Sequence, residues 1–346
     1  MLSDAYADAV IAATMELARH PRGVLALERH LEDDLGLRPP RRVAVLREAA
    51  RRLGMKVTER EAAEAATCRR LADLVEILKR FPRAIAPAGR LSGKVALITG
   101  SGHGVGRETA RELAREGAAV IVNSFHSRAR GDELARELTD AGHEALHVWG
   151  SVAQPAHLDA LFAQVRDRYG RLDFFVSNAS NGFVGPIEEI TPELWERAYR
   201  TNVMGFHRGA IRAAELMTRG GRIITLSSPG ARWTFELFSC QGTVKAAVEA
   251  LARHLAFELA PRNIHVQAIS CGPIHGEQLR SFPDHDQWLP WLEGRSAGGQ
   301  ILSEPEVARF VLKLLTDPVM PAASGTLIEL DRAISALVAP FKSGTA

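Results

Sequence analysis

Hydrophobic residues in the first 80 positions recur every three to four residues, which is the spacing of an amphipathic helix. This pattern predicts helices over residues 5–18, 24–31, 41–53 and 71–78. Residues 82–90 interrupt the pattern with two prolines and a glycine, a composition typical of a linker. We therefore expect a small all-α domain over residues 1–81, followed by a linker over residues 82–90.

Beyond residue 90, short and nearly continuous apolar runs alternate with amphipathic segments. The runs predict strands at 95–98, 119–122, 145–148, 174–176, 222–226, 265–269 and 326–330. The segments between them predict helices at 107–116, 132–141, 157–169, 193–217 and 242–259. Strands that are apolar on both faces and alternate with helices are typical of a parallel sheet covered on both sides. Residues 91–346 are thus predicted to form one α/β domain with a doubly wound parallel sheet.

Composition and charge exclude several classes of function. The chain has 346 residues, of which 46% are hydrophobic, so it can build the core of such a domain. Its net charge is only +2 and its arginines are scattered, which gives no support for nucleic-acid binding. No apolar stretch is long enough to span a membrane, and the three cysteines share no metal-ligand spacing. We expect a cytoplasmic protein without a metal site.

A glycine-rich turn follows the first predicted strand of this domain. Gly100, Gly104 and Gly106 lie between that strand and the next helix. Glycines in this position allow a tight turn and a close approach of the backbone to a pyrophosphate, which then binds at the helix N-terminus. The turn predicts a Rossmann-type dinucleotide site formed by Gly100, Ser101, His103, Gly104, Val105 and Gly106.

The end of the second predicted strand bears on the choice of cofactor. Residues 122–128 read VNSFHSR and contain no Asp or Glu that could accept a hydrogen bond from a ribose 2′-hydroxyl. That absence favours NADP(H) over NAD(H). Arg128, His126 and His103 are the candidate partners for the 2′-phosphate.

Further motifs follow along the domain in a fixed order. They are TGSGHGVG at 99–106, SNAS at 177–180, Asn202, Ser228 at a strand end, Lys245 near a helix start, and CGP at 271–273. They resemble the TGxxxGxG, NNAG, asparagine, serine, YxxxK and PG motifs of the short-chain dehydrogenase/reductase family. The resemblance implies catalytic roles for Ser228, Lys245 and Asn202, and a homodimer or homotetramer. It also implies cofactor contacts from Ser151, Val152, Asn178, Ala179, Lys245, Gly272, Pro273 and Ile274.

Within that family the segments around these motifs are most similar to the third class of short-chain enoyl-acyl-carrier-protein reductases. In that class the catalytic tyrosine can lie seven residues before the lysine rather than four. This chain has Phe238 and Gln241 at those two positions, and no tyrosine between Ser228 and Lys245. Because an alkoxide formed from a ketone must be protonated, ketone reduction depends on the phenol. Gln241 and Ser228 can still donate hydrogen bonds to an enolate, so enoyl reduction survives the replacement better.

Three functions are compatible with these residues. The first is NADP-dependent reduction of an acyl thioester on an acyl carrier protein or CoA, enoyl before 3-ketoacyl, in fatty-acid-like or polyketide-like biosynthesis. The second is a non-redox reaction on the same scaffold, catalysed by a dehydratase, isomerase or cyclase. The third is a catalytically silent subunit that binds a partner. The presence of Asn202, Ser228 and Lys245 favours the readings in which chemistry occurs.

The N-terminal segment carries a weaker resemblance of its own. LEDDLGL at residues 31–37 is similar to the motif that precedes the modified serine of acyl carrier proteins. Arg38, Pro39 and Pro40 stand where that serine would be expected, so no hydroxyl is present to carry phosphopantetheine. The resemblance implies a degenerate carrier domain used for docking or dimerisation; the alternative is an ordinary small helical bundle.

Overall fold

The structure is a computed structural model that describes residues 5–18, 20–21, 25–52, 57, 59–80, 89–280 and 285–336. The chain divides into two compact units, one of residues 1–88 with 139–143 and the other of residues 89–138 with 144–346. The linker predicted at 82–90 lies outside the described residues except for Gly89 and Arg90. Each unit is described separately below.

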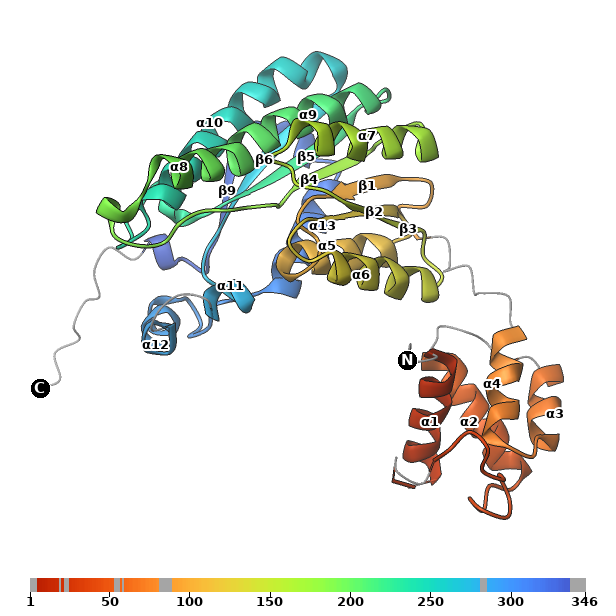
Figure 1. Cartoon of the computed structure of the whole chain (residues 1–346). Coiled ribbons are helices and arrows are strands. Elements are labelled where there is room, and N and C mark those ends of the chain that lie inside the picture. Colours follow the sequence, from red (N-terminus) through yellow and green to blue (C-terminus); the bar gives the residue numbers. More distant parts are fainter. Residues whose placement is uncertain are drawn as a thin grey trace, which may run out of the picture. The chain divides into compact units, whose positions relative to one another are not determined.

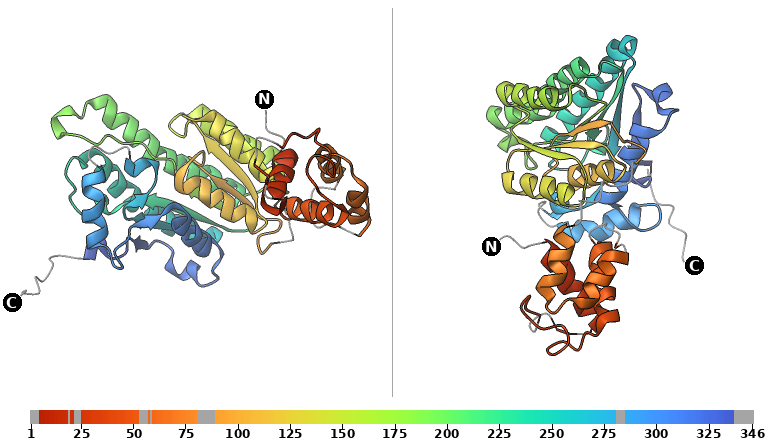
Figure 2. Two further views of the ribbon diagram at one scale, coloured as in Figure 1. Left: turned by 90° about the horizontal axis from the view of Figure 1, so that it is seen from below. Right: turned by 90° about the vertical axis from the view of Figure 1, so that its right-hand side faces the viewer.

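The N-terminal unit is a bundle of helices (Figure 2). Its described helices are α1 (Ala5–Ala18), α2 (Pro39–Arg52), α3 (Glu59–Thr67) and α4 (Leu71–Arg80). Their apolar faces meet in one core, in which Leu31, Leu46 and Leu74 are fully buried. The helices at 5–18, 41–53 and 71–78 were predicted from periodicity; α3 was not, because its apolar positions are almost all alanine.

The helix predicted at 24–31 is wrong, since the described residues 25–31 form turns and a β-bridge. Their backbone groups bond to a distant segment instead. The amide of Leu31 donates to the carbonyl of Arg69 at 2.7 Å, and the amide of Ala72 donates to the carbonyl of Leu27 at 2.9 Å. Tertiary hydrogen bonds therefore replace those that a local helix would have made.

The second unit contains, among its described residues, a seven-stranded parallel sheet with the order β3-β2-β1-β4-β5-β6-β9. This confirms the predicted doubly wound α/β fold. The sequential order reverses between β1 and β4, where ligands of such sheets bind. The strands are β1 (Val95–Ile98), β2 (Ala119–Ser124), β3 (Ala145–Trp149), β4 (Phe174–Ser177), β5 (Gly221–Ser227), β6 (Ile264–Cys271) and β9 (Leu327–Leu330).

Helices cover both faces of this sheet (Figure 1). One layer contains α7 (Pro155–Tyr169), α9 (Gly205–Leu216) and α10 (Ser239–Leu259); the other contains α5 (Gly104–Arg115), α6 (Arg128–Asp140) and α13 (Glu304–Thr316). Successive strand residues pack on opposite faces of the sheet: Phe175 contacts the first helix layer and Val176 the second. This two-sided burial explains why the strands are apolar throughout.

The helix predicted at 193–217 is divided in three. It consists of α8 (Pro192–Tyr199), one π-helical turn (Arg200–Met204) and α9. A π-helical turn carries an extra residue and is frequent at functional sites. Asn202 lies within this turn and is almost completely buried.

The remaining elements follow β6. They are β7 (Ile274–His275), α11 (Glu277–Arg280), α12 (His285–Arg295), β8 (Leu302–Ser303) and α13. Helix α13 was not predicted from the sequence, although Ser303 and Glu306 form a capping box at its start. No helix in the described ranges has the length and apolar character needed to cross a membrane.

Candidate active site

The candidate residues gather where the strands end at one edge of the parallel sheet. Thr99 follows β1, Asn178 follows β4, Ser228 follows β5 and Gly272 follows β6. Because parallel strands end at a common edge, residues that are far apart in the sequence meet there. Across the described ranges, no group of three or more His, Cys, Asp or Glu side chains is placed to hold a metal ion.

The glycine loop is packed too closely for side chains. Gly100 has φ +65°, and a Cβ there would lie 2.8 Å from the Cα of Ala179. A Cβ at Gly106 would lie 2.5 Å from Nδ2 of Asn178 and 2.7 Å from the carbonyl oxygen of Gly100. The loop therefore presents bare backbone at the start of α5, which fits the pyrophosphate of a dinucleotide.

Asn178 clamps this loop to β4. Its Nδ2 donates to the carbonyl oxygens of Thr99 at 2.9 Å and Gly100 at 3.0 Å. In return, Oγ1 of Thr99 accepts from the amides of Asn178 at 3.1 Å and Ala179 at 3.2 Å. The structure thus places the Asn178 side chain against the loop backbone, where it holds the loop in shape.

Ser101 joins the loop to β2. Its hydroxyl donates to the carbonyl of Ile98 at 2.8 Å and accepts from the amide of Asn123 at 3.1 Å. The buried side chain of Asn123 continues the connection, since Nδ2 donates to the carbonyls of Val148 and Gly150, both at 3.0 Å. These bonds fix the ends of β1, β2 and β3 relative to one another.

Of three further predicted cofactor residues, Val105 lies in the first turn of α5, and Ser151 and Val152 follow the end of β3. Val105 is partly buried and packs against the core under α5. The amide of Ser151 donates to Nδ1 of His157 at 3.2 Å. Val152 is buried against Gly205, where a Cβ would lie 3.1 Å from Cγ2 of Val152.

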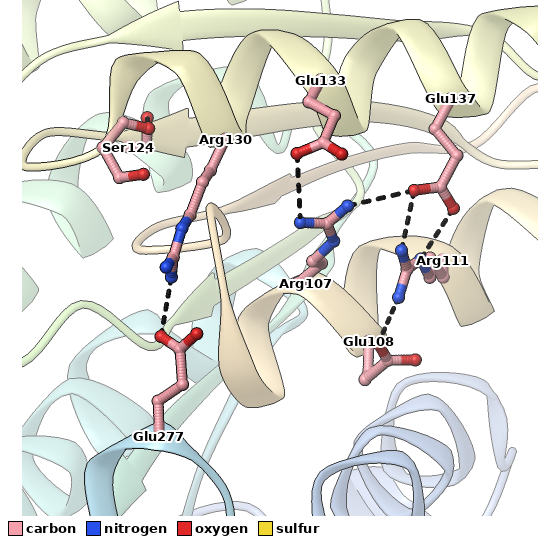
Figure 3. A network of polar contacts seen from close by, with 9 residues as sticks. Arg107, Glu108, Arg111, Ser124, Arg130, Glu133, Glu137 and Glu277 are labelled. Atoms are coloured by element: carbon pink, nitrogen blue, oxygen red, sulfur yellow. Dashed lines mark hydrogen bonds and ion pairs between the residues drawn. The ribbon is translucent and has the colours of Figure 1, made fainter. Parts of the chain in front are cut away.

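An arginine that the sequence pattern did not indicate, Arg130, lies beside the glycine loop. A Cβ at Gly102 would lie 3.2 Å from Cβ of Ser124, the last residue of β2, and 3.8 Å from Cβ of Arg130. Nη1 of Arg130 is 2.6 Å from Oε2 of Glu277 in α11 (Figure 3). Half of each side chain is exposed, so this ion pair adds little to stability. The guanidinium is consequently available to a stronger anion.

The three predicted phosphate partners lie differently. Cζ of Arg128 sits 5.9 Å from the ring centroid of Trp149. The ring of His126 packs edge-on against Phe125, with centroids 4.8 Å apart. His103 caps α5 in an extended conformation and is exposed. His103 thus follows the end of β1, and His126 and Arg128 follow the end of β2.

Ion pairs tie α5 to α6 next to this region (Figure 3). Nη2 of Arg111 is 2.7 Å and Nη2 of Arg107 is 3.2 Å from Oε2 of Glu137. Arg111 also pairs with Glu108 at 2.5 Å, and Arg107 with Glu133 at 3.7 Å. The network holds α5 and α6 together next to the glycine loop.

Lys245 lies buried on α10 at the end of β5. Its Nζ donates to the carbonyl oxygen of Leu226 at 2.9 Å. Burial lowers the pKa of Lys245 to about 8, although Cys271 and Glu249 oppose that shift. Burial raises the pKa of the Cys271 thiol to about 12. Glu249 is held in turn by the hydroxyl of Ser227, which donates to its Oε1 at 2.7 Å.

Gln241 is hydrogen-bonded into a chain that reaches Asn202. Its Nε2 donates to Oγ of Ser180 at 3.1 Å, and that hydroxyl donates to Oδ1 of Asn202 at 2.9 Å. Nδ2 of Asn202 donates to the carbonyls of Ala198 at 2.9 Å and Asn181 at 2.5 Å. The structure thus brings together two of the four predicted catalytic residues, with Ser180 between them.

Two buried polar atoms at this site have no hydrogen-bond partner among the described residues: Oγ of Ser228 and Oε1 of Gln241. Apolar rings lie beside them. A Cβ at Gly230 would lie 2.5 Å from the ring of Phe238, and that ring contacts Phe235 with centroids 6.1 Å apart. Buried polar atoms are nearly always bonded, so an unpartnered hydroxyl at a strand end fits a site that receives a ligand oxygen.

The turn after β6 is anchored from two sides. The amide of Gly272 donates to the carbonyl of Leu330 at 2.9 Å, and the amide of Leu302 donates to the carbonyl of Pro273 at 3.1 Å. Ile274 pairs with Leu302 in the short β7–β8 sheet. The predicted turn residues therefore stand at the same sheet edge as Ser228 and Lys245.

The sequence analysis assigned no individual role to several residues of the site: Thr99, Asn123, Ser124, Arg130, Ser180 and Gly182. A signal existed for Thr99, which opens the glycine motif, and for Ser180, which replaces the glycine of NNAG. Asn123 and Arg130 carry no comparable signal, because their roles depend on contacts across the fold.

Comparisons with known proteins agree with this arrangement. A family model described as Enoyl-(Acyl carrier protein) reductase matches residues 100–331. The 1-cyclohexenylcarbonyl-CoA reductase of Streptomyces collinus is 34% identical over 251 residues, covering 72% of this chain and 89% of that enzyme. The versicolorin reductase of Emericella nidulans is 30% identical over 256 residues, covering 70% of this chain and 96% of that enzyme.

Solved structures show the same likeness. A gluconate 5-dehydrogenase from Burkholderia cenocepacia, in complex with NADP and tartrate, has a TM-score of 0.67 and 27% sequence identity, covering 72% of this chain and 98% of that one. The shared fold, the ordered motifs and the family match lead to one conclusion. The chain belongs to the short-chain dehydrogenase/reductase family.

Proposed function

We propose that this protein is an NADP-dependent reductase of acyl thioesters that acts on enoyl rather than 3-ketoacyl groups. One observation carries the proposal: one helical turn before Lys245 on α10, where the family has its tyrosine, the chain has a buried amide, Gln241, which donates a hydrogen bond but not a proton. The Streptomyces collinus relative supports it, because its name specifies reduction of an unsaturated acyl-CoA.

The residues present suit the steps of enoyl reduction. A nicotinamide cofactor held at the glycine loop would supply the hydride for the β-carbon of the substrate, and the electrons of the double bond would move toward the thioester oxygen. Ser228 and Gln241 donate hydrogen bonds to that developing enolate oxygen. Solvent then protonates the α-carbon, so no side chain has to act as an acid. Lys245 would bind the cofactor ribose from its buried position on α10.

Reduction of a ketone makes a greater demand on the same site. The alkoxide is far more basic than a thioester enolate and must receive a proton as it forms. Of the two side chains that approach the substrate oxygen, Ser228 has no base or acid bonded to it among the described residues. The proposal therefore places 3-ketoacyl thioesters well below enoyl thioesters in rate.

The preference for NADP(H) rests on the end of β2. Ser124 offers no carboxylate to a ribose 2′-hydroxyl, and Arg130 lies next to Gly102 of the glycine loop. A phosphate dianion competes well with the single exposed carboxylate of Glu277 for this guanidinium. We assign Arg130 to the 2′-phosphate, together with the previously predicted Arg128, His126 and His103.

The oligomeric state and the carrier remain part of the proposal. Phe257 on α10 is 84% exposed and Ile211 on α9 is 38% exposed, which supports association through these two helices. Light scattering of the purified chain should give the mass of a dimer or tetramer. A carrier protein loaded with the acyl group should react at least as fast as the CoA thioester.

The deciding experiment uses the purified full-length chain and follows NADPH absorbance. Crotonyl-CoA should oxidise NADPH, and acetoacetyl-CoA should do so at least about tenfold more slowly, which corresponds to a barrier difference of 1.4 kcal/mol. Lys245→Ala should abolish both rates. Normal NADPH binding without turnover of either thioester, free or carrier-bound, would overturn the proposal and favour the non-redox or silent alternatives.

A further inference from the structure

Ser180 and Gln241 are two of the positions at which this chain departs from the family motifs, and they are bonded to each other. Ser180 replaces the glycine of NNAG, and Gln241 replaces the tyrosine four residues before Lys245. Although 61 residues separate them, Nε2 of Gln241 lies 3.1 Å from Oγ of Ser180. Ser180 stands at an exposed position, but its two partners, Asn202 and Gln241, are 3% and 6% exposed.

The direction of this hydrogen-bond chain is set by the backbone. The side-chain amide of Asn202 faces two carbonyl oxygens, those of Ala198 and Asn181. Carbonyl oxygens only accept hydrogen bonds, so the nitrogen of Asn202 must point to them. Its Oδ1 is thereby turned toward Ser180, at 2.9 Å.

Ser180 passes this direction on to Gln241. A hydroxyl has one hydrogen, and Ser180 gives it to Oδ1 of Asn202. The hydroxyl oxygen of Ser180 can therefore only accept a hydrogen bond from Gln241. For that reason the amide nitrogen of Gln241, and not its carbonyl oxygen, must face Ser180. Oε1 of Gln241 then lies on the side of Gly182, where a Cβ would come within 1.6 Å of it.

An amide fixed in this way has a defined second donor. Nε2 carries two hydrogens, and among the described residues only Ser180 accepts one. An amide that could flip would bring its carbonyl oxygen to the reaction site part of the time, where it would repel an enolate. The unpartnered hydroxyl of Ser228 supplies the other donor.

On this basis we infer that Ser180 is a positioning residue: it locks the Gln241 amide so that an N–H, paired with the Ser228 hydroxyl, serves the substrate oxygen. The inference rests on the proposed function for the identity of that oxygen. It makes these two departures from the family motifs a matched pair, in which the hydroxyl is required because the phenol is absent.

The test is a double-mutant cycle with crotonyl-CoA as substrate. Gln241→Met keeps the side-chain length but removes both donors, and kcat should fall about tenfold. Ser180→Ala frees the amide, and the loss of one hydrogen bond should lower kcat about three- to tenfold. Ser180→Thr retains the hydroxyl and should stay within about twofold of the parent. In the Gln241→Met background, Ser180→Ala should have no further effect.

Two measurements separate a positioning role from a general structural one. The NADPH dissociation constant should not change in any of these variants, so that the whole effect appears in kcat. As a control, Ser324→Ala removes a hydroxyl outside the site, one that accepts a hydrogen bond from the amide of Val266. This substitution should leave kcat unchanged. Additive effects of Ser180→Ala and Gln241→Met, or failure of Ser180→Thr to retain activity, would overturn the inference.

The inference and the proposed function can fail independently. If the parent protein turns over no thioester, the proposed function fails, and the lock is then tested by thermal unfolding of the same four proteins. A lock predicts that the midpoint shifts of Ser180→Ala and Gln241→Met are not additive, and additive shifts would exclude it. If turnover occurs but the kinetic cycle is additive, only the lock is wrong.

Discussion

The cofactor side and the reaction side of the site are built in opposite ways. On the cofactor side, Thr99, Gly100 and Asn178 satisfy each other's hydrogen bonds, and glycines bring backbone against backbone. On the reaction side, the hydroxyl of Ser228 and one N–H of Gln241 have no acceptor among the described residues. The comparison teaches that the fold fixes the cofactor loop by itself, whereas the reaction side is completed by its ligand.

The largest effect is expected from placing a side chain at Gly106 in the glycine loop. In Gly106→Ala the new Cβ would meet the carbonyl of Gly100 at 2.7 Å and Cα of Ser101 at 2.9 Å. Because backbone cannot move aside, we expect a loss of about 1–3 kcal/mol in stability. NADPH affinity, measured by fluorescence titration, should fall at least about a hundredfold, as 2.7 kcal/mol would give.

The matched control is Gly294→Ala in α12, where a Cβ would meet nothing within 4 Å. It should be neutral or slightly stabilising, because alanine favours a helix over glycine. If Gly106→Ala binds NADPH as the parent does, the loop is not the pyrophosphate site.

The second effect tests the choice of cofactor. Arg130→Ala should weaken NADPH binding about 10- to 100-fold, the range for a charge-assisted hydrogen bond of about 1.5–3 kcal/mol, and leave NADH within about twofold. Glu277→Gln removes the competing carboxylate and should strengthen NADPH binding. Equal losses for both cofactors would contradict this assignment, and a loss confined to Arg128→Ala would move it to Arg128.

A third and smaller effect is expected on the reaction side. In Gly182→Ala the new Cβ would overlap only the end of a side chain, Oε1 of Gln241. Gln241 can swing away at the expense of its bond to Ser180, so the fold should persist while kcat falls about tenfold, the value for 1.4 kcal/mol. Circular dichroism and NADPH titration should match the parent. A collapse of the fold, as large as that from Gly106→Ala, would remove the contrast between the two sides.

The fourth expected effect is on stability rather than on catalysis, and it concerns Lys245. Its folded pKa of about 8 lies below the ordinary value of 10.5, so the folded protein is penalised for the charge at neutral pH. Lys245→Met should stabilise the cofactor-free protein by about 1–2 kcal/mol at pH 7. This gain is smaller than the free energy that corresponds to the full pKa shift, because the Leu226 carbonyl loses its hydrogen-bond donor.

The pH dependence provides the check on Lys245. Between pH 8 and 10.5 the folded parent releases its proton before the unfolded chain does, so its stability rises toward that of Lys245→Met. Thermal melts at pH 7 and pH 10 should show the difference shrinking. A difference that stays constant with pH would mean that the charge on Lys245 is not the cause.

The amino-acid pattern by itself determined the doubly wound sheet, the glycine loop and the absence of a tyrosine before Lys245. These features are local: strands buried on both faces must be apolar throughout, and a turn packed against backbone must be glycine. Where local pattern and tertiary bonding compete, as at residues 25–31, the helix predicted from periodicity is wrong.

Only the tertiary structure decided which polar residues meet. Arg130 reaches Glu277 across 147 residues, and Gln241 reaches Ser180 across 61. Neither pair has a sequence spacing that would reveal it. The orientation of the Gln241 amide depends on two carbonyls of other segments, those of Ala198 and Asn181. Side-chain identity thus sets which hydrogen bonds are possible, and the packing of distant segments selects the ones that form.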